Sequence, residues 1–414
     1  MALIVQKYGG SSVADAEKIK SVARRVALRK EEGNDVVVVV SAMGDTTDQL
    51  IILAHQVSER PDNRELDVLL STGETISSTL LALALKSTGY EAISLSGAQA
   101  GIRTDTVYSR ARIVKIESER IVRELNEGKI VIVAGFQGIT PSLDVTTLGR
   151  GGSDTTAVAM AASLKAEACE IFTDVEGVYT ADPRLVPEAR KLKDIDYEEM
   201  LELASYGTRV LHPRAVELGE LFDIPILVAS SFVQRPGTMI HGGPAMEVRN
   251  KVRAIAHDLD VAKITVLGVP DQPGIATSLF EPLSKENVSV DTIVQNASVE
   301  RVTDLTFTVA RGDLERAMKV IEPVAASINA RGCVADAMLG KVSIVGSGMQ
   351  NAPGYAARMF RALSDAGINI ELIATSEIRI TCIIGQDRVQ DAVVALHQAF
   401  ELDKGEQEGL HSTQ

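Results

Sequence analysis

The chain has 414 residues, of which 45% are hydrophobic and 24% are charged. These proportions are those of globular proteins, not of disordered or fibrous ones, and the length suits two or three domains. The formal net charge is −14, aromatic residues make up 4% and there is no tryptophan. Such a chain is a poor candidate for binding nucleic acid or an anionic membrane, because both need basic surfaces and single strands also need stacking. An anionic ligand would require a locally basic site.

The cysteines and the apolar segments indicate where the protein resides. Cys169, Cys333 and Cys382 lie far apart among apolar or small residues, which favours reduced, buried thiols over a disulfide or zinc site. The apolar run at the N-terminus is too short for a secretory signal. The longest apolar stretch is well below the roughly 18 residues that a membrane span needs. We therefore expect a cytoplasmic protein.

The first 245 residues alternate short apolar runs with stretches of helical periodicity. Residues 36–40 are all valine, a pattern typical of a parallel strand that is buried on both faces. Further strands are expected at 3–5, 92–95, 130–134 and 169–173, with helices at about 19–26, 66–86 and 155–164 between them. This order predicts an α/β domain with an open, mainly parallel sheet flanked by helices, and ligands bind at the carboxyl ends of such strands.

An internal repeat, offset by about 80 residues, follows residue 245. Residues 263–268 resemble 341–346, Pro-Gly recurs at 273–274 and 353–354, and 288–291 resemble 368–371. Each copy predicts a ferredoxin-like βαββαβ unit, and two units placed edge to edge would cover each other's open strands. We therefore expect three domains, at 1–245, at 246–340 with a linker, and at 341–414 with a polar tail.

The first candidate site is the turn after the first predicted strand. Lys7 is followed by Gly9 and Gly10 and then by a helical segment. Glycines allow backbone N–H groups to close on an anion, and the lysine supplies a point charge to a phosphoryl oxygen. The alternative is a tight strand–helix turn with an exposed lysine.

The second candidate is the glycine-rich segment before the helix at 155–164. Residues 149–156 read GRGGSDTT, so Arg150 flanks a glycine-lined helix start that suits an anion. Asp154 would repel that anion unless a cation lies between them, and the alternative is that Ser153 or Asp154 simply caps the helix. Two anion-binding turns at one sheet edge suit a substrate with two charged ends.

The third candidate is the segment 173–184, which follows a strand and is predicted to form a hairpin with its turn near 176–177. Asp174 could orient a metal or a ribose, while Tyr179 and Arg184 could hold a base and phosphates. A solvated polar hairpin explains the same spacing equally well. The six histidines are scattered, and 212–214 reads as a helix entry with proline at its first position. No histidine base is evident, which suggests a nucleophile that needs no deprotonation.

At these residues the chain resembles the aspartokinases of the amino-acid kinase family, of the type with two C-terminal ACT domains. The matching segments run in the family's order over nearly the whole chain, at 5–13, 36–50, 71–74, 134–140, 147–162, 172–184, 210–217, 271–276, 290–296 and 369–380. The resemblance implies transfer of the γ-phosphoryl group of ATP to the β-carboxylate of L-aspartate, giving 4-phospho-L-aspartate. That reaction begins lysine, threonine and methionine synthesis. A carboxylate is already ionised at neutral pH, which accounts for the missing base.

The resemblance also implies roles for individual residues. Lys7 and Asp154 would be catalytic, with Lys7 stabilising the transferred phosphoryl group and Asp154 organising the cations of the site. The residues that would contact ATP are Lys7, Tyr8, Gly9, Gly10, Ser41, Thr173, Asp174, Tyr179, Asp182, Arg184 and Arg209. Those that would hold aspartate are Ser41, Thr47, Glu74, Arg150, Gly151, Gly152, Ser153 and Asp154. Glu74 suits the substrate ammonium and Arg150 its α-carboxylate. Mg²⁺ would be held through the ATP phosphates and by no set of protein side chains alone.

Two segments depart from the family's pattern. Arg209 stands where the family usually has lysine, which keeps the charge but changes the geometry of the donor. Residues 104–112, TDTVYSRAR, lack the small residues expected there, so this loop differs from the family's pattern while the segments that imply the reaction match it.

ACT pairs resemble amino-acid sensors, which implies allosteric binding of lysine, threonine or both at the interface between the units. The candidate effector residues are Asp271, Gly274, Ile275, Ala276, Gln295, Asn296, Asn369, Ile370, Thr375, Ser376 and Glu377. Self-association through the ACT domains is expected. Met246 lies just before this region, and an internal start there would give an α₂β₂ assembly with a smaller regulatory subunit.

Two rival interpretations are a kinase of the same fold that acts on glutamate or acetylglutamate, and an amino-acid sensor that binds nucleotide without catalysis. Glu74 and the ACT pair oppose the first, and Lys7 together with Asp154 opposes the second.

Overall fold

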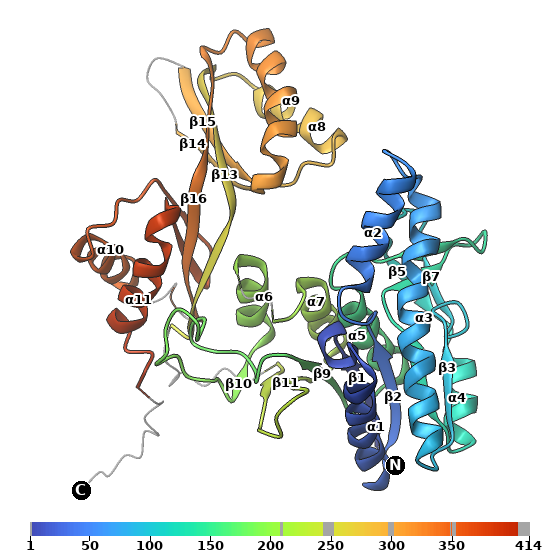
Figure 1. Ribbon diagram of the computed structural model, residues 1–414. Coiled ribbons are helices and arrows are strands. Elements are labelled where there is room, and N and C mark those ends of the chain that lie inside the picture. Colours follow the sequence, from blue (N-terminus) through green and yellow to red (C-terminus); the bar gives the residue numbers. More distant parts are fainter. Residues whose placement is uncertain are drawn as a thin grey trace, which may run out of the picture. The chain divides into compact units, whose positions relative to one another are not determined.

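The computed structural model describes residues 2–207, 210–242, 252–296, 302–347, 349 and 353–404. The chain forms two compact units. The first unit comprises residues 1–179, 191–205 and 209–247, and the second comprises 180–190, 206–208 and 248–414. Figure 1 shows the chain coloured from the N-terminus to the C-terminus.

An eight-stranded sheet forms the centre of the first unit, in the order β10-β12-β11-β9-β1-β2-β6-β3. The strands are β1 (Leu3–Tyr8), β2 (Asp35–Val40), β3 (Ala92–Leu95), β6 (Ile130–Ala134), β9 (Ala168–Thr173), β10 (Asp194–Ile195), β11 (Ile226–Ser230) and β12 (Thr238–Ile240). All neighbouring pairs are parallel except β11 with β12. The expectation of an open, mainly parallel sheet is confirmed, and the valines of β2 are completely buried.

Helices line the sheet, as the alternating pattern predicts. They are α1 (Ala16–Glu31), α2 (Thr46–Val57), α3 (Asn63–Ser87), α4 (Glu119–Asn126), α5 (Gly152–Leu164), α6 (Tyr197–Tyr206) and α7 (Pro213–Phe222). Val36, Val38 and Val40 pack with buried residues of α1 and α3, while Val39 points the other way and lies near the start of α5. By length and composition α3 alone among the described helices could cross a membrane, but half of its most apolar window is buried, as in the core helix of a globular domain.

A smaller sheet of the first unit has the order β5-β4-β7-β8. Its strands are β4 (Ile102–Thr104), β5 (Ile113–Ile116), β7 (Gln137–Ile139) and β8 (Val145–Thr147). The buried carboxylate of Asp67 in α3 accepts hydrogen bonds from the backbone N–H groups of Ser109 and Thr147, both at 2.8 Å, and from the Thr147 hydroxyl at 2.7 Å. This buried acceptor therefore holds the unusual 104–112 segment against β8.

The second unit contains one six-stranded antiparallel sheet in the order β14-β15-β13-β16-β18-β17. Its elements are β13 (Ala254–Pro270), α8 (Ile275–Lys285), β14 (Val290–Gln295), β15 (Val302–Val309), α9 (Leu314–Ser327), β16 (Gly332–Val345), α10 (Tyr355–Asp365), β17 (Leu372–Thr375), β18 (Arg379–Gly385) and α11 (Val389–Ala399). The helix pairs α8–α9 and α10–α11 each cover a separate hydrophobic core. Two ferredoxin-like units are thus present, as the repeat predicts.

The second copy of the repeat is completed by a strand segment that precedes the first copy, which the repeat alone does not predict. Residues 254–258 at the start of β13 pair with 341–345 of β16 and supply the fourth strand of the second copy. Residues 261–270 of the same strand belong to the first copy. The segment 180–190 also joins this unit, since the Thr180 carbonyl accepts a hydrogen bond from the Ile255 N–H at 2.8 Å. Each compact unit is assembled from three separate segments of the chain. The domain boundaries near 245 and 340 remain predictions.

The three cysteines are free, with Cys169 and Cys382 buried and Cys333 half-buried. Burial raises the pKa of each thiol, which keeps these groups protonated at neutral pH.

Candidate functional site

An ion pair between β1 and α5 occupies the carboxyl edge of the central sheet. Lys7 Nζ lies 2.7 Å from Asp154 Oδ1, and the two side chains are only 11% and 13% exposed. Lys7 comes from β1, which lies between β2 and β9, and Asp154 comes from the first turn of α5. The cation required by an anionic ligand is therefore built into the sheet edge, where a parallel α/β fold binds its ligands.

The glycines before α5 are tightly enclosed on three sides. A Cβ atom on Gly149 would approach the Ser109 carbonyl oxygen to 3.1 Å, one on Gly151 would lie 2.2 Å from the His212 ring, and one on Gly152 would lie 2.9 Å from Phe136. Gly149 and Gly151 also have φ values of 77° and 69°, which side chains disfavour. We call residues 149–152 the glycine loop. Space and backbone conformation therefore require glycine at 149 and 151, and space requires it at 152.

The N-cap residue of α5 decides between the two interpretations of Asp154. The N-cap of α5 is Gly151, and no side chain caps the helix. The alternative in which Ser153 or Asp154 caps α5 is therefore wrong, because the helix begins earlier than the sequence suggests. Asp154 instead directs its carboxylate to Lys7, and its position in the first turn is favourable to a negative charge.

The turn after β1 brings a second pair of glycines close to β2. Gly10 begins a short 3₁₀ helix (Gly10–Val13), and a Cβ atom there would lie 2.8 Å from the Ala42 carbonyl oxygen. A Cβ atom on Gly9 would be 3.4 Å from Lys7 Nζ. The side chain of Tyr8 is completely buried and stacks on Phe172 with ring centroids 4.9 Å apart. Tyr8 therefore offers only its backbone to a ligand.

Glu74 is the buried acid of the predicted aspartate site. Its Oε1 accepts a hydrogen bond from the Ala42 N–H at 3.1 Å, while Oε2 is buried without a hydrogen-bond partner among the described residues. Burial raises the pKa of Glu74 to about 7. An unpartnered buried oxygen calls for a donor, and an ammonium group of a ligand would supply one.

The remaining predicted aspartate contacts lie around the same edge. Ser41 follows β2, and its carbonyl accepts a hydrogen bond from the Ser77 hydroxyl of α3 at 2.7 Å. Thr47 is half-buried in the first turn of α2, and Arg150 is exposed in the glycine loop. The structure therefore brings Ser41 and Glu74 together across the β2–α3 contact, and it leaves the Arg150 guanidinium open to solvent.

The turns after β1, β9 and β11 are joined by hydroxyl groups. Ser12 donates to the Ser231 hydroxyl at 2.9 Å, and Ser231 donates to the Thr173 carbonyl at 3.1 Å. Thr173 in turn donates to the carboxylate of Asp174 at 3.0 Å. Thr173 and Asp174 therefore lie beside the Lys7 turn, as the predicted nucleotide site requires.

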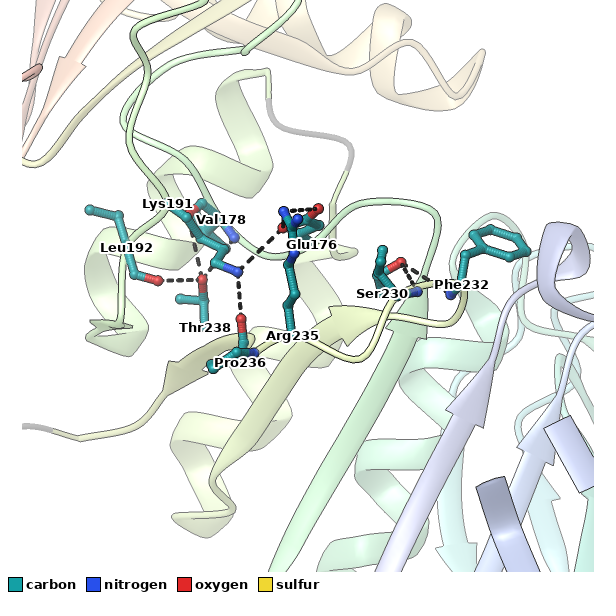
Figure 2. Close-up of polar contacts among 10 residues, drawn as sticks. Glu176, Val178, Lys191, Leu192, Ser230, Phe232, Arg235, Pro236 and Thr238 are labelled. Atoms are coloured by element: carbon teal, nitrogen blue, oxygen red, sulfur yellow. Dashed lines mark hydrogen bonds and ion pairs between the residues drawn. The ribbon is translucent and has the colours of Figure 1, made fainter. Parts of the chain in front are cut away.

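The predicted hairpin at 173–184 does not form. Residues that are distant in the sequence hold this segment as an irregular loop (Figure 2). Glu176 forms ion pairs with Lys191 at 3.6 Å and with Arg235 at 3.3 Å. The Thr238 hydroxyl accepts from the Val178 N–H at 2.9 Å and donates to the Leu192 carbonyl at 2.6 Å. Tyr179 makes a single antiparallel bridge with Lys191 and is half-buried.

Three predicted nucleotide contacts are not described as part of the first unit. Asp182 and Arg184 belong to the second unit, where they form an ion pair at 2.7 Å and Arg184 is 87% exposed. The Arg184 guanidinium lowers the pKa of Asp182. Arg209 lies outside the described residues.

The candidate effector residues divide between the two ends of the second unit's sheet. Gly274 caps α8 and Gln295 ends β14, whereas Thr375 ends β17, and β14 and β17 are the two outermost strands. The first group comprises Asp271, Gly274, Ile275, Ala276, Gln295 and Asn296, and the second comprises Asn369, Ile370, Thr375, Ser376 and Glu377. All are exposed or half-buried. Within one chain, the two groups of candidate effector residues therefore lie at opposite edges of the sheet.

Two residues next to the glycine loop have no assigned role in the sequence prediction. His212 caps α7, with proline at the first helical position, which confirms the predicted helix entry. Arg214 donates to the carbonyl oxygens of Leu148 at 2.8 Å and Ala111 at 3.2 Å. The motif at 212–214 marks the helix start, but it gives no sign of these distant backbone partners.

With this geometry in view, comparison with known proteins is informative. Residues 2–230 match the amino acid kinase family, and residues 264–323 and 342–400 match the ACT domain. The chain is 51% identical to an aspartokinase of Bacillus sp. (strain MGA3) over 97% of this chain and 98% of that protein. It is 49% identical to the aspartokinase of Corynebacterium glutamicum, over 99% and 98% of the two chains.

Solved structures of aspartokinases are also similar to this chain. Aspartokinase III of E. coli in complex with aspartate and ADP superposes with a TM-score of 0.82 at 25% identity, over 96% of this chain and 99% of that one. The lysine and aspartate complex of the same enzyme gives a TM-score of 0.74 at 25% identity, over 96% and 99%.

The chain therefore belongs to the amino acid kinase family, whose model matches residues 2–230. Within that family it is an enzyme of the aspartokinase branch that ends in a tandem of ACT domains.

The Lys7–Asp154 pair yields a test that separates catalysis from stability. Replacing Lys7 with methionine should lower kcat by about 10³-fold or more, because a buried cation is lost from the phosphoryl site. It should also lower the melting temperature, since Asp154 is left buried and unpaired. The double variant Lys7→Met/Asp154→Asn should recover the melting temperature but not kcat. Recovery of kcat to within tenfold of the unmodified enzyme would show that Lys7 acts only as a structural counter-ion.

Proposed function

We propose that this enzyme transfers the γ-phosphoryl group of ATP to the β-carboxylate of L-aspartate and forms 4-phospho-L-aspartate and ADP. The observation that carries the proposal is the enclosed Lys7–Asp154 pair between two glycine turns at one sheet edge. One turn suits the phosphates and the other the amino-acid substrate. The relatives that match over nearly their full length are aspartokinases, which supports this choice of substrate.

The chemistry needs positioning and charge more than proton transfer. A β-carboxylate oxygen attacks the γ-phosphorus, the bond from that phosphorus to the bridging oxygen of ADP breaks, and the electron pair leaves with ADP. Aspartate is ionised at neutral pH, so no base is required. Lys7 would stabilise the negative charge on the transferred group, and the backbone N–H groups after Gly9 would orient the phosphates.

Asp154 and the glycine loop would organise the acceptor. Asp154 holds the Lys7 side chain in place through the 2.7 Å contact. Arg150 would pair with the substrate α-carboxylate, and Glu74 would accept the ammonium group with its unpartnered Oε2. Mg²⁺ would be held through the ATP phosphates, and its charge would neutralise them. The described residues contain no group of three or more His, Cys, Asp or Glu side chains arranged to bind a metal.

We also propose that the reaction begins a biosynthetic sequence. An acyl phosphate is activated for reduction, and on the resemblance described above the products further on are lysine, threonine and methionine. A cytoplasmic location suits an enzyme that uses ATP and a free amino acid. Both statements are part of the proposal.

Acceptor specificity is the direct test of this function. Hydroxylamine traps acyl phosphates as hydroxamates, so the enzyme with Mg-ATP should form a hydroxamate from aspartate and little or none from glutamate or N-acetylglutamate. Equal rates with glutamate would assign the chain to another kinase of this fold. Absence of product with every acceptor would favour a sensor without catalysis.

The raised pKa of Glu74 predicts a pH dependence of substrate binding. The free enzyme holds a proton on Glu74 below pH of about 7, and binding of an ammonium group requires the ionised form. At saturating Mg-ATP, KM for aspartate should therefore rise about tenfold between pH 8 and pH 6. In the Glu74→Gln variant KM should be high and nearly independent of pH. A flat KM in the unmodified enzyme over this range would contradict the assignment.

Regulation by lysine, threonine or both is proposed for the second unit. The outer strands β14 and β17 each have one partner among the described strands, and an open strand edge is a template for pairing with another chain. Pairing of two copies through these edges would bring the two groups of effector residues together. Feedback then requires that the effector bind the less active arrangement more tightly.

A route from the effector site to the catalytic unit exists along the chain. Tyr206, the last residue of α6, donates to Asp291 of β14 at 3.2 Å, and the Arg379 guanidinium lies 3.6 Å from the centre of its ring. Lys341 forms an ion pair with the same Asp291. A shift of β14 on effector binding would therefore act directly on the end of α6.

Effector-site variants should separate inhibition from catalysis. Gln295→Ala and Thr375→Ala remove exposed polar groups at the ends of β14 and β17, so each should raise the half-inhibitory concentration of the effector by tenfold or more while kcat changes little. Gln398→Ala, an exposed glutamine of α11, serves as the matched control. Lysine and threonine are tested singly and together. Unchanged inhibition curves in both variants would place the effector elsewhere.

The α₂β₂ assembly remains part of the proposal. Met246 lies outside the described residues, and its use as an internal start would yield a regulatory subunit that contains both ACT repeats. Denaturing electrophoresis of the untagged native enzyme should then show a second, smaller band. A single band would exclude this assembly.

A further inference from the structure

The glycine loop is held from the side of α7 by two residues that reach across from a distant part of the chain. Arg214 donates to the Leu148 carbonyl, immediately before the loop, and to the Ala111 carbonyl of the neighbouring segment. Both acceptor residues are buried. Bonds from a charged donor to buried carbonyl groups are stronger than neutral ones. One guanidinium therefore ties together two backbone segments that border the loop.

His212 packs against the loop at Gly151. A Cβ atom on Gly151 would lie 2.2 Å from the His212 ring, so the ring is in close contact with the loop backbone. His212 Nδ1 accepts a hydrogen bond from the Arg214 N–H at 3.3 Å, which fixes the ring at the start of α7. Burial lowers the pKa of His212, so the ring is neutral at pH 7 and can act as such an acceptor.

Three of the four residues of the glycine loop are glycines, so the loop's own side chains do little to fix its shape. Its N-cap Gly151 carries no side chain, and the helix has no side-chain cap. Arg150 is exposed, so its position depends on the conformation of the backbone that carries it. A small displacement of this backbone would move Arg150 and the first turn of α5 relative to the acceptor substrate.

We infer that Arg214 and His212 are positioning residues that set the aspartate affinity by fixing the shape of the glycine loop. This inference rests on the proposed function, in which the loop binds the carboxylate of aspartate. Neither residue touches the reacting atoms. Their effect should therefore fall on the acceptor and leave the nucleotide side, built by the turns after β1, β9 and β11, unaffected.

Steady-state kinetics of the full-length enzyme test the inference. Arg214→Met should raise KM for aspartate at least tenfold while KM for ATP stays within twofold. Arg214→Lys can reach one of the two carbonyl groups, so its KM for aspartate should lie between those of the unmodified enzyme and the methionine variant. His212→Gln, which keeps an acceptor but loses the ring, should raise KM for aspartate about threefold or more. A merely structural role would instead raise both KM values or lower the melting temperature without this split.

Arg25→Met is the matched control, since Arg25 is also half-buried but donates to the Ser230 carbonyl at 2.7 Å on the nucleotide side. Its KM for aspartate should be unchanged. Arg150→Gln, assayed in parallel, shows whether a negative result overturns only the positioning role of Arg214 or also the binding of aspartate by the glycine loop. If Arg150→Gln raises KM for aspartate and Arg214→Met does not, the inference is overturned and the proposed function stands. If neither variant changes KM for aspartate, the loop does not bind aspartate, and both the inference and the substrate contacts proposed for the loop are overturned, while the hydroxamate assay decides the function itself.

Discussion

The ion pair between Lys7 and Asp154 is the interaction on which the catalytic unit depends. A chain with a net charge of −14 must hold a cation where two anions meet, and it must do so in an enclosed place. Lys7 is carried there by the central strand β1, and Asp154 meets it at 2.7 Å from the first turn of α5. The carboxylate neutralises the lysine until a phosphate arrives, which avoids the large cost of burying an isolated charge. The glycines on both sides are required by close neighbours, since a side chain on Gly10 would meet the Ala42 carbonyl oxygen and one on Gly151 would meet the His212 ring.

The second unit depends on a different feature: its two ferredoxin-like halves share the long strands β13 and β16. Strands β13 and β16 each pass through both ferredoxin-like halves, so the start of β13 completes the copy that lies later in the sequence. Each half keeps its own helix-covered core, but neither has a full sheet without the other. An effector that alters one half therefore acts on strands that belong to both. Tyr206, the last residue of α6, contacts this sheet through a hydrogen bond to Asp291 and through the Arg379 guanidinium over its ring.

Local patterns and long-range contacts differ in how far the sequence reveals them. The valines of β2, the positions of Lys7 and the glycines, and the repeat after residue 245 could be predicted, since each is expressed by neighbouring residues. The cap of α5 could not, because the helix begins at a glycine whose space is limited by His212 some sixty residues away. The sequence predicts a hairpin at 173–184, yet Glu176 and Val178 within it contact the distant residues Lys191, Arg235 and Thr238. The buried Asp67 and the bridging Arg214 serve backbone groups, which leave no trace in side-chain patterns.

The measurement that tests the account most directly is a crystal structure of the enzyme with a non-hydrolysable ATP analogue, Mg²⁺ and aspartate. The account predicts Lys7 Nζ within hydrogen-bonding distance of a terminal phosphate oxygen. It also predicts the aspartate β-carboxylate in line with that phosphorus, with the ammonium group on Glu74 and the α-carboxylate on Arg150. Phosphates bound away from the turn after β1, or aspartate bound away from the glycine loop, would contradict it.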